Sequence, residues 1–137
     1  LKKTQMKSTS YAVSLEPFTQ RHFIKYFAKK YKNAWDITLK IIIIDFEQVE
    51  LLFLRDVAET IIDSPDVKIC KTEFKIAGTG DSRHSSGNRC IVAIHKNINM
   101  VCVLLVYNKN DLDGGNETAR WKNLVKENYP EYSKMLK

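Results

Sequence analysis

The chain has 137 residues, a hydrophobic content of 44% and a formal net charge of +6. This length leaves no room for a second independent core, and no apolar run approaches the ~20 residues that span a bilayer. We therefore expect a loose segment over residues 1–10 and a single domain over residues 11–137, in a cytoplasmic protein without a membrane segment. The three cysteines form no C-x-x-C pair, which excludes a zinc ribbon and indicates reduced, buried thiols.

The charge is unevenly distributed along the chain. Residues 1–40 carry nine basic and two acidic side chains, whereas residues 41–70 carry two basic and seven acidic ones. A basic surplus favours a polyanionic partner such as nucleic acid or an acidic protein, although solubility explains it equally well. The sequence thus predicts one acidic, strongly apolar element between two basic ones.

The N-terminal elements are predicted to be a short strand and a basic helix. Apolar residues alternate from Tyr11 to Leu15, which is typical of a strand, and Pro17 ends it. Thr19 can cap a helix that extends to Tyr31, because its apolar residues recur at helical spacing. Four lysines lie away from most of this apolar stripe, and they belong either to a solvated face or to a phosphate-binding surface: Lys25, Lys29, Lys30 and Lys32.

The next apolar stretch, residues 36–62, is predicted to be one long helix. The four isoleucines at 41–44 would also suit a strand, but the apolar residues recur at helical spacing over several turns. Two interpretations remain open. The helix either packs on two sides within its own domain or leaves an apolar face for a partner. The predicted apolar face consists of Ile37, Ile41, Ile44, Leu51, Leu52 and Ala58.

Three strands and a final helix are predicted to follow. Residues 70–76 alternate as a half-buried strand would, which places their lysines on one face. A loop rich in Gly and Ser, residues 78–88, leads into a strand at 89–95. A turn at 96–99 leads into an apolar strand at 100–107 that we expect to be covered on both faces. Asn116 can cap the last helix. We expect an α+β fold with a small antiparallel-meander sheet and the order β-α-α-β-β-β-α.

Several motifs that would indicate nucleotide binding, hydrolysis or metal binding are absent or incomplete. The segment GTGDS at 78–82 lacks the G-K-[ST] ending of a phosphate loop, and no G-x-S-x-G hydrolase turn is present. The histidines at 22, 84 and 95 lack the spacing of metal ligands. We therefore expect no metal and no cofactor.

A resemblance to a known family rests on three short segments. The sequence SSGNRCIV at residues 85–92 resembles the RelE/ParE superfamily of small toxins from type II toxin–antitoxin operons, in which a loop ending S-G-x-R opens the middle strand of a meander. The segment FKI at 74–76 resembles the family's lysine-bearing strand, and VYNK at 106–109 its final strand. The chain departs from the family pattern at Ala77 and Asn108, where relatives often have a basic residue and a histidine. The resemblance implies a RelE-like fold from about Tyr11 to the C-terminus.

The RelE-like branch is favoured here, and it implies metal-independent, ribosome-dependent cleavage of messenger RNA. The 2′-hydroxyl would attack the adjacent phosphate, which requires a base, an acid and positive charge on the transition state. Arg89 would hold phosphate oxygens, Lys75 would act as base, and Lys109 would act as acid or second phosphate clamp. Tyr107 would stack a base, and His84 is an alternative acid–base. The predicted substrate-binding residues are Lys71, Arg83 and Asn108.

Other functions remain open at this stage. The ParE-like branch poisons DNA gyrase, so the chain could be a non-nucleolytic inhibitor, and a third hypothesis is an inactive protein-binding module. Under the toxin hypotheses the partners are mRNA on the ribosome and a cognate antitoxin. That antitoxin would wrap the apolar helix at 36–62, neutralise the basic face and form a toxin–antitoxin hetero-oligomer.

Overall fold

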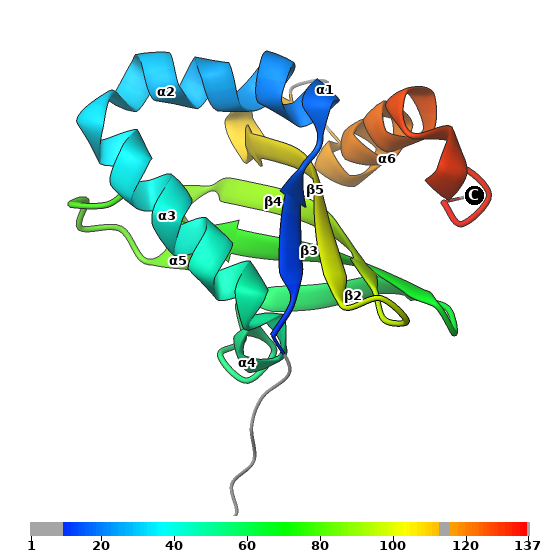
Figure 1. Cartoon of the computed structure of the whole chain (residues 1–137). Helices are drawn as coiled ribbons and strands as arrows, with labels where there is room; N and C mark the ends of the chain where they lie inside the picture. Colours follow the sequence, from blue (N-terminus) through cyan, green and yellow to red (C-terminus); the bar gives the residue numbers. More distant parts are fainter. Residues whose placement is uncertain (1–9, 113–115, 137) are drawn as a thin grey trace, which may run out of the picture.

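The computed structural model describes residues 10–112 and 116–136, and it folds as an α+β domain built on one five-stranded sheet (Figure 1). Apart from Ser10, the predicted loose segment lies outside the described residues. The strand order is β1-β5-β4-β3-β2, and every neighbouring pair is antiparallel except β1 with β5, which is parallel. The sheet is therefore mixed rather than a small antiparallel meander. The strands are β1 Ala12–Leu15, β2 Ala58–Asp63, β3 Val67–Phe74, β4 Asn88–His95 and β5 Met100–Asn108.

Helices flank the sheet on both faces. The longest are α3 and α6, and the N-terminal helical segment contains five residues with π-helical geometry. Thr19 lies inside that segment, which begins at Pro17, so Thr19 does not cap it as predicted. The helices are α1 Pro17–Thr19, η1 Gln20–Ile24, α2 Lys25–Tyr31, α3 Asn33–Glu47, α4 Val49–Leu52, α5 Arg83–Ser86, η2 Lys109–Asp111, α6 Glu117–Asn128 and η3 Pro130–Tyr132.

The sheet separates two hydrophobic clusters. On one face Trp35 and Phe46 of α3 pack with Phe74 of β3. On the other face Trp121 and Val125 of α6 join buried residues of β3, β4 and β5. Strands β4 and β5 are buried along nearly their whole length, which confirms the prediction of a central strand covered on both faces. None of the helices in residues 10–112 and 116–136 is long and apolar enough to cross a membrane.

The predicted long helix at 36–62 is wrong beyond Leu52. Helix α3 ends at Glu47, because Gln48 leaves the helical conformation with φ −120° and ψ 47°. The short α4 follows, and the chain then reverses at Asp56, which has a left-handed φ of 59°. From Ala58 onward the chain pairs with β3 as an edge strand. The β-branched residues at 60–62 suit that strand. The apolar residues of this segment also happen to fit the helical spacing of α3, but pairing with β3 decides its structure.

Helix α3 buries only one of its apolar faces. Ile42 and Phe46 are 3% and 2% exposed against the sheet. The face predicted to be the apolar stripe points the other way, since Ile37, Ile41 and Ile44 are 54%, 45% and 54% exposed. The interpretation in which the helix packs on two sides within its own domain does not fit, because this apolar face of α3 is exposed. In the described part of the chain, these three isoleucines are not covered.

The three cysteines are buried and free, as the sequence predicts. Burial raises the pKa of the Cys70 and Cys90 thiols to about 12. Both thiols therefore stay protonated near neutral pH and act as small apolar side chains.

The predicted loop at 78–88 contains a four-residue helix, α5, which a capping box opens and Gly87 closes. Ser82 Oγ accepts a hydrogen bond from Ser85 N at 3.0 Å. Gly87 has φ +78°, and a Cβ there would lie 3.3 Å from both Asn108 Nδ2 and Lys109 Cγ. Left-handed backbone and close approach to β5 both require glycine at this position.

Replacing Gly87 with alanine is expected to lower the free energy of unfolding by about 1–3 kcal/mol, the usual range for backbone strain of this kind. Gly80→Ala is the matched control, because a Cβ at Gly80 meets nothing within 4 Å. We expect it to change stability by no more than about 0.5 kcal/mol. Urea denaturation measures both. Equal effects of the two substitutions would contradict the assigned role of Gly87.

Candidate functional site

Three polar side chains form a row across the sheet beside α5. Glu73 of β3 lies opposite Arg89 of β4, which in turn lies opposite Tyr107 of β5. Directly paired residues on one face of a sheet are in contact range, so the register itself assembles this row. Tyr107 belongs to the hydrophobic cluster beneath α6, which places the row on the face that α6 covers.

Arg89 lies under α5 rather than on the surface. Its side chain is 5% exposed, and Nη2 is 3.6 Å from Glu73 Oε2. Nη1 donates to the carbonyl of Asn88 at 3.1 Å, and Nη2 donates to the carbonyl of His84 at 3.2 Å. These contacts tie the short helix to the sheet. In this conformation the guanidinium bonds the protein itself, and the predicted phosphate contact would require α5 to move.

Tyr107 is similarly enclosed. Its hydroxyl donates a 2.7 Å hydrogen bond to Glu117 Oε2, in the first turn of α6. Burial, and secondarily this bond to Glu117, raise the pKa of Tyr107 far above its usual value, so the phenol stays protonated near neutral pH. Lys71 Nζ lies 3.9 Å from the same carboxylate oxygen. Glu117 thus joins β3 and β5 to α6.

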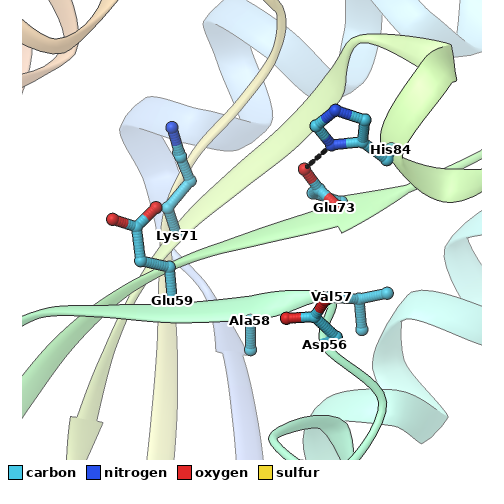
Figure 2. A pocket seen from close by; sticks show the side chains of 7 residues that line it. All are labelled: Asp56, Val57, Ala58, Glu59, Lys71, Glu73 and His84. Carbon is cyan, nitrogen blue, oxygen red and sulfur yellow. Dashed lines mark hydrogen bonds and ion pairs between the residues drawn. The ribbon is translucent and has the colours of Figure 1, made fainter.

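His84 is the exposed member of this group. Its side chain is 82% exposed, and Nδ1 lies 2.8 Å from Glu73 Oε2. Because a carboxylate accepts hydrogen bonds, we assign the Nδ1 hydrogen to this contact, which leaves Nε2 as the free nitrogen. Figure 2 shows the ring held at Nδ1 while its other nitrogen points away from Glu73. A histidine oriented by a carboxylate is suited to accept or donate protons.

An open pocket of about 360 Å³ lies between the start of β2, β3 and the α5 helix (Figure 2). His84 and Lys71 line it, and both were predicted site residues. Lys71 is paired with Glu59 across the β3–β2 ladder. Asp56 and Glu59 bring negative charge to the β2 side of the pocket. Glu73 adds a third carboxylate on the β3 side, where Lys71 is the basic side chain of the pocket.

The other predicted residues lie elsewhere around α5. Arg83 donates a 2.7 Å hydrogen bond from Nη1 to Asp45 Oδ2 of α3, and it lines a cavity of about 140 Å³ together with Lys75. Asn108 Nδ2 donates to the carbonyl of Ser86 at 3.2 Å, which fastens the α5 loop to β5. Lys109 is exposed beside Gly87. The predicted residues thus form two groups: Lys71, His84, Arg89 and Tyr107 on the α6 face, and Lys75 and Arg83 beside α3.

Comparison with protein-family models, curated proteins and solved structures finds no match to this chain. In residues 10–112 and 116–136 no group of three or more histidine, cysteine or acidic side chains could hold a metal ion. The site geometry carries the functional argument.

Two residues of the site were missed by the sequence analysis, Glu73 and Glu117. Glu73 lies two residues from both Lys71 and Lys75, so the period-two pattern places it on the same face of the strand as the two lysines. That signal could have identified it as the partner of a basic residue. Glu117 follows the capping residue Asn116. An acidic residue at this position is usually explained by its favourable interaction with the helix N-terminus. Nothing local in the sequence places it over Tyr107.

Proposed function

We propose that the chain is the toxin of a toxin–antitoxin pair and acts as a ribosome-dependent messenger-RNA endoribonuclease of RelE-like type. The observation that carries this proposal is the pair of His84 and Glu73, which lines an open pocket with Lys71. Strands β3, β4 and β5 pair antiparallel in succession, and Gly87 and Arg89 lie where the chain enters β4. This arrangement supports the family resemblance. The proposal differs from the sequence-based expectation in its base, which is His84 rather than Lys75, and in its acid, which is Lys71 rather than Lys109.

The proposed chemistry is transfer within the RNA chain. His84 Nε2 takes the proton of a 2′-hydroxyl as its oxygen attacks the adjacent phosphorus. Lys71 stabilises the added negative charge and gives a proton to the departing 5′-oxygen, so the products are a 2′,3′-cyclic phosphate and a 5′-hydroxyl. Glu73 orients the imidazole through Nδ1 and stabilises it once it is protonated, as the third member of a catalytic triad does. Arg89 is a positioning residue, since it holds both Glu73 and the α5 backbone.

The exposed cations Lys75 and Lys109 are proposed to contact phosphates on either side of the cleaved bond. Their contribution is electrostatic, so it should weaken as salt concentration rises. Neither side chain has an ion-pair partner within the described residues. This separates them from Arg83, which is already paired with Asp45.

Expression of the wild-type chain is expected to arrest growth and leave mapped cuts in translated messages. His84→Ala should reduce the cleavage rate about 100-fold or more, because a positioned acid–base residue contributes typically 10²–10⁴-fold. Lys40→Ala is the control, because Lys40 is exposed on α3 outside the pocket. Sequencing of message ends reports the cuts. An unaltered cleavage rate in His84→Ala would rule out the assigned base.

We also propose that the cognate antitoxin covers the Ile37–Ile41–Ile44 face of α3. This face is apolar and exposed, and the preceding helix α2 carries exposed lysines, so an acidic amphipathic segment would be complementary to this part of the chain. Co-expression of an antitoxin from a neighbouring reading frame should relieve growth arrest by the wild type. It should fail to relieve arrest by an Ile41→Arg, Ile44→Arg double variant, which remains toxic because the site is intact. Full rescue of that variant would place the antitoxin elsewhere.

A second candidate function is non-nucleolytic inhibition of gyrase or another protein target. It is favoured by the enclosure of Arg89 and Tyr107, whose polar groups already bond Glu73 and Glu117. The negative charge of Asp56 and Glu59 at the pocket also fits a protein surface better than RNA. This function predicts growth arrest with intact messages, and arrest that His84→Ala does not relieve. The message-mapping experiment therefore separates the two candidates.

A further inference from the structure

A second cavity of about 240 Å³ opens where the N-terminal helical segment meets the end of β5. His22, Phe23 and Tyr26 line it from η1 and α2, and Tyr107 and Leu112 line it from the other side. It is smaller than the ~300–1,000 Å³ of typical drug-sized ligand sites, so it suits one planar ring. Its walls are mainly aromatic and apolar.

The π-helical turn shapes this cavity. The Lys25 N–H donates to the Gln20 carbonyl five residues earlier, which is the hydrogen bond that defines the wider turn. Such turns appear frequently at functional sites. His22 packs on Phe18 with ring centroids 4.5 Å apart, so contact with Phe18 restricts the orientation of the His22 ring. Tyr26 is braced edge-on by Phe27 at 5.7 Å and remains 47% exposed.

Basic side chains lie on the same elements as the aromatic wall. Arg21, Lys25 and Lys29 are exposed on the same two short helices. Lys30 Nζ lies 5.7 Å from the centroid of the Tyr26 ring, which places a cation beside one of the side chains that line the cavity. Exposed aromatic rings set among lysines and arginines are the arrangement that holds single-stranded nucleic acid, with bases stacked and phosphates paired. Asp111 provides an acceptor that can bind the amino group of a base.

We infer that this cavity is a nucleobase-binding site for single-stranded RNA, with Tyr26 and His22 as the stacking side chains. The inference rests on the proposed endoribonuclease function and extends it to the RNA-binding path. Tyr107 links the two sites, since it lines this cavity and pairs across the sheet with Arg89, which lies opposite Glu73. Neighbouring strands are about 5 Å apart, so the row from β5 to β3 covers about 10 Å. The two cavities therefore lie at the same end of the sheet.

The test is equilibrium binding of a fluorescent oligoadenylate RNA of about eight nucleotides, a length within the usual site size of single-strand-binding proteins. A second probe has the same ribose–phosphate backbone without bases. Fluorescence anisotropy of the purified chain should show that Tyr26→Ala weakens binding of oligoadenylate about tenfold or more, as loss of one stacked base does. Binding of the abasic probe should not change. Tyr26→Phe, which keeps the ring, should bind as the wild type does.

Ile98→Ala is the control, because Ile98 is 60% exposed in the β4–β5 turn, and it should leave binding unchanged. Equal affinity of the wild type for both probes would overturn the inference. So would oligoadenylate binding that is insensitive to Tyr26→Ala, which is the result expected if a protein partner fills the cavity. Binding that depends on Tyr26 without any message cleavage by the wild type would overturn the proposed function and support the binding site.

Discussion

Replacing Arg89 with alanine is expected to destabilise the protein by about 3 kcal/mol or more, a loss typical of a buried ion pair that has lost one partner. The guanidinium is 5% exposed, pairs with Glu73, and donates to two backbone carbonyls. Without it, the Glu73 carboxylate keeps only His84, and the carbonyls of His84 and Asn88 each lose one donor. Urea denaturation of wild type and variant measures the difference in free energy of unfolding.

Lys109→Ala is the matched control, since Lys109 is a neighbouring cation with an exposed side chain. It should change stability by no more than about 0.5 kcal/mol. A similarly small effect of Arg89→Ala would show that the guanidinium is replaceable by water and free to bind phosphate. If the large effect is found, loss of toxicity in Arg89→Ala reports unfolding, and His84→Ala remains the informative catalytic variant.

Replacing Trp121 with alanine is expected to lower the free energy of unfolding by about 3–5 kcal/mol, the usual range for a large aromatic side chain in a core. Trp121 is fully buried and is the principal side chain by which α6 packs on the sheet. Its loss should also release Glu117 from Tyr107 and Lys71, because the first turn of α6 carries that carboxylate. Thermal and urea denaturation report the stability, and the absorbance titration of tyrosine reports the release of Tyr107.

Trp121→Phe separates ring packing from hydrogen bonding. The buried indole Nε1 has no hydrogen-bond partner among residues 10–112 and 116–136, so phenylalanine removes an unsatisfied donor while keeping most of the apolar contact. We expect it to cost about 1.5 kcal/mol or less. A loss as large as that of Trp121→Ala would mean that the indole N–H is bonded in solution.

The C-terminal half of the fold could be predicted from the sequence because its signals are local. Alternation defines β3, the apolar run at 100–107 defines β5, and Asn116 caps α6 through a 3.1 Å bond from the Ala119 N–H. Strand β4 begins one residue before its predicted start. The sequence did not predict the α5 helix, because a four-residue helix held by a serine capping box and Gly87 has the same residue composition as a polar loop.

The errors arose where long-range contacts decide the structure. Residues 58–63 fit a helical pattern, and only the exposed edge of β3 makes them a strand. The predicted apolar face was right only in part. Ile37, Ile41 and Ile44 share an exposed face of α3, whereas Leu52 is buried on α4 and Ala58 belongs to β2. Periodicity could not say that Ile42 and Phe46 face the sheet while Ile41 faces outward. The site shows the same limit. Basic residues at strand ends suggested phosphate contacts, yet four of the predicted site residues already contact a carboxylate: His84 and Arg89 contact Glu73, and Lys71 and Tyr107 contact Glu117.

The parallel pairing of β1 with β5 has a consequence for the order in which the protein folds during synthesis. Strand β1 leaves the ribosome before β2, β3 and β4, but its partner β5 emerges only after them. Contacts between such distant segments form slowly, so the nascent chain carries an incomplete sheet at least until β5 has emerged. Glu117 emerges later still. A nascent chain therefore completes the folded site only after the first turn of α6 has been synthesised.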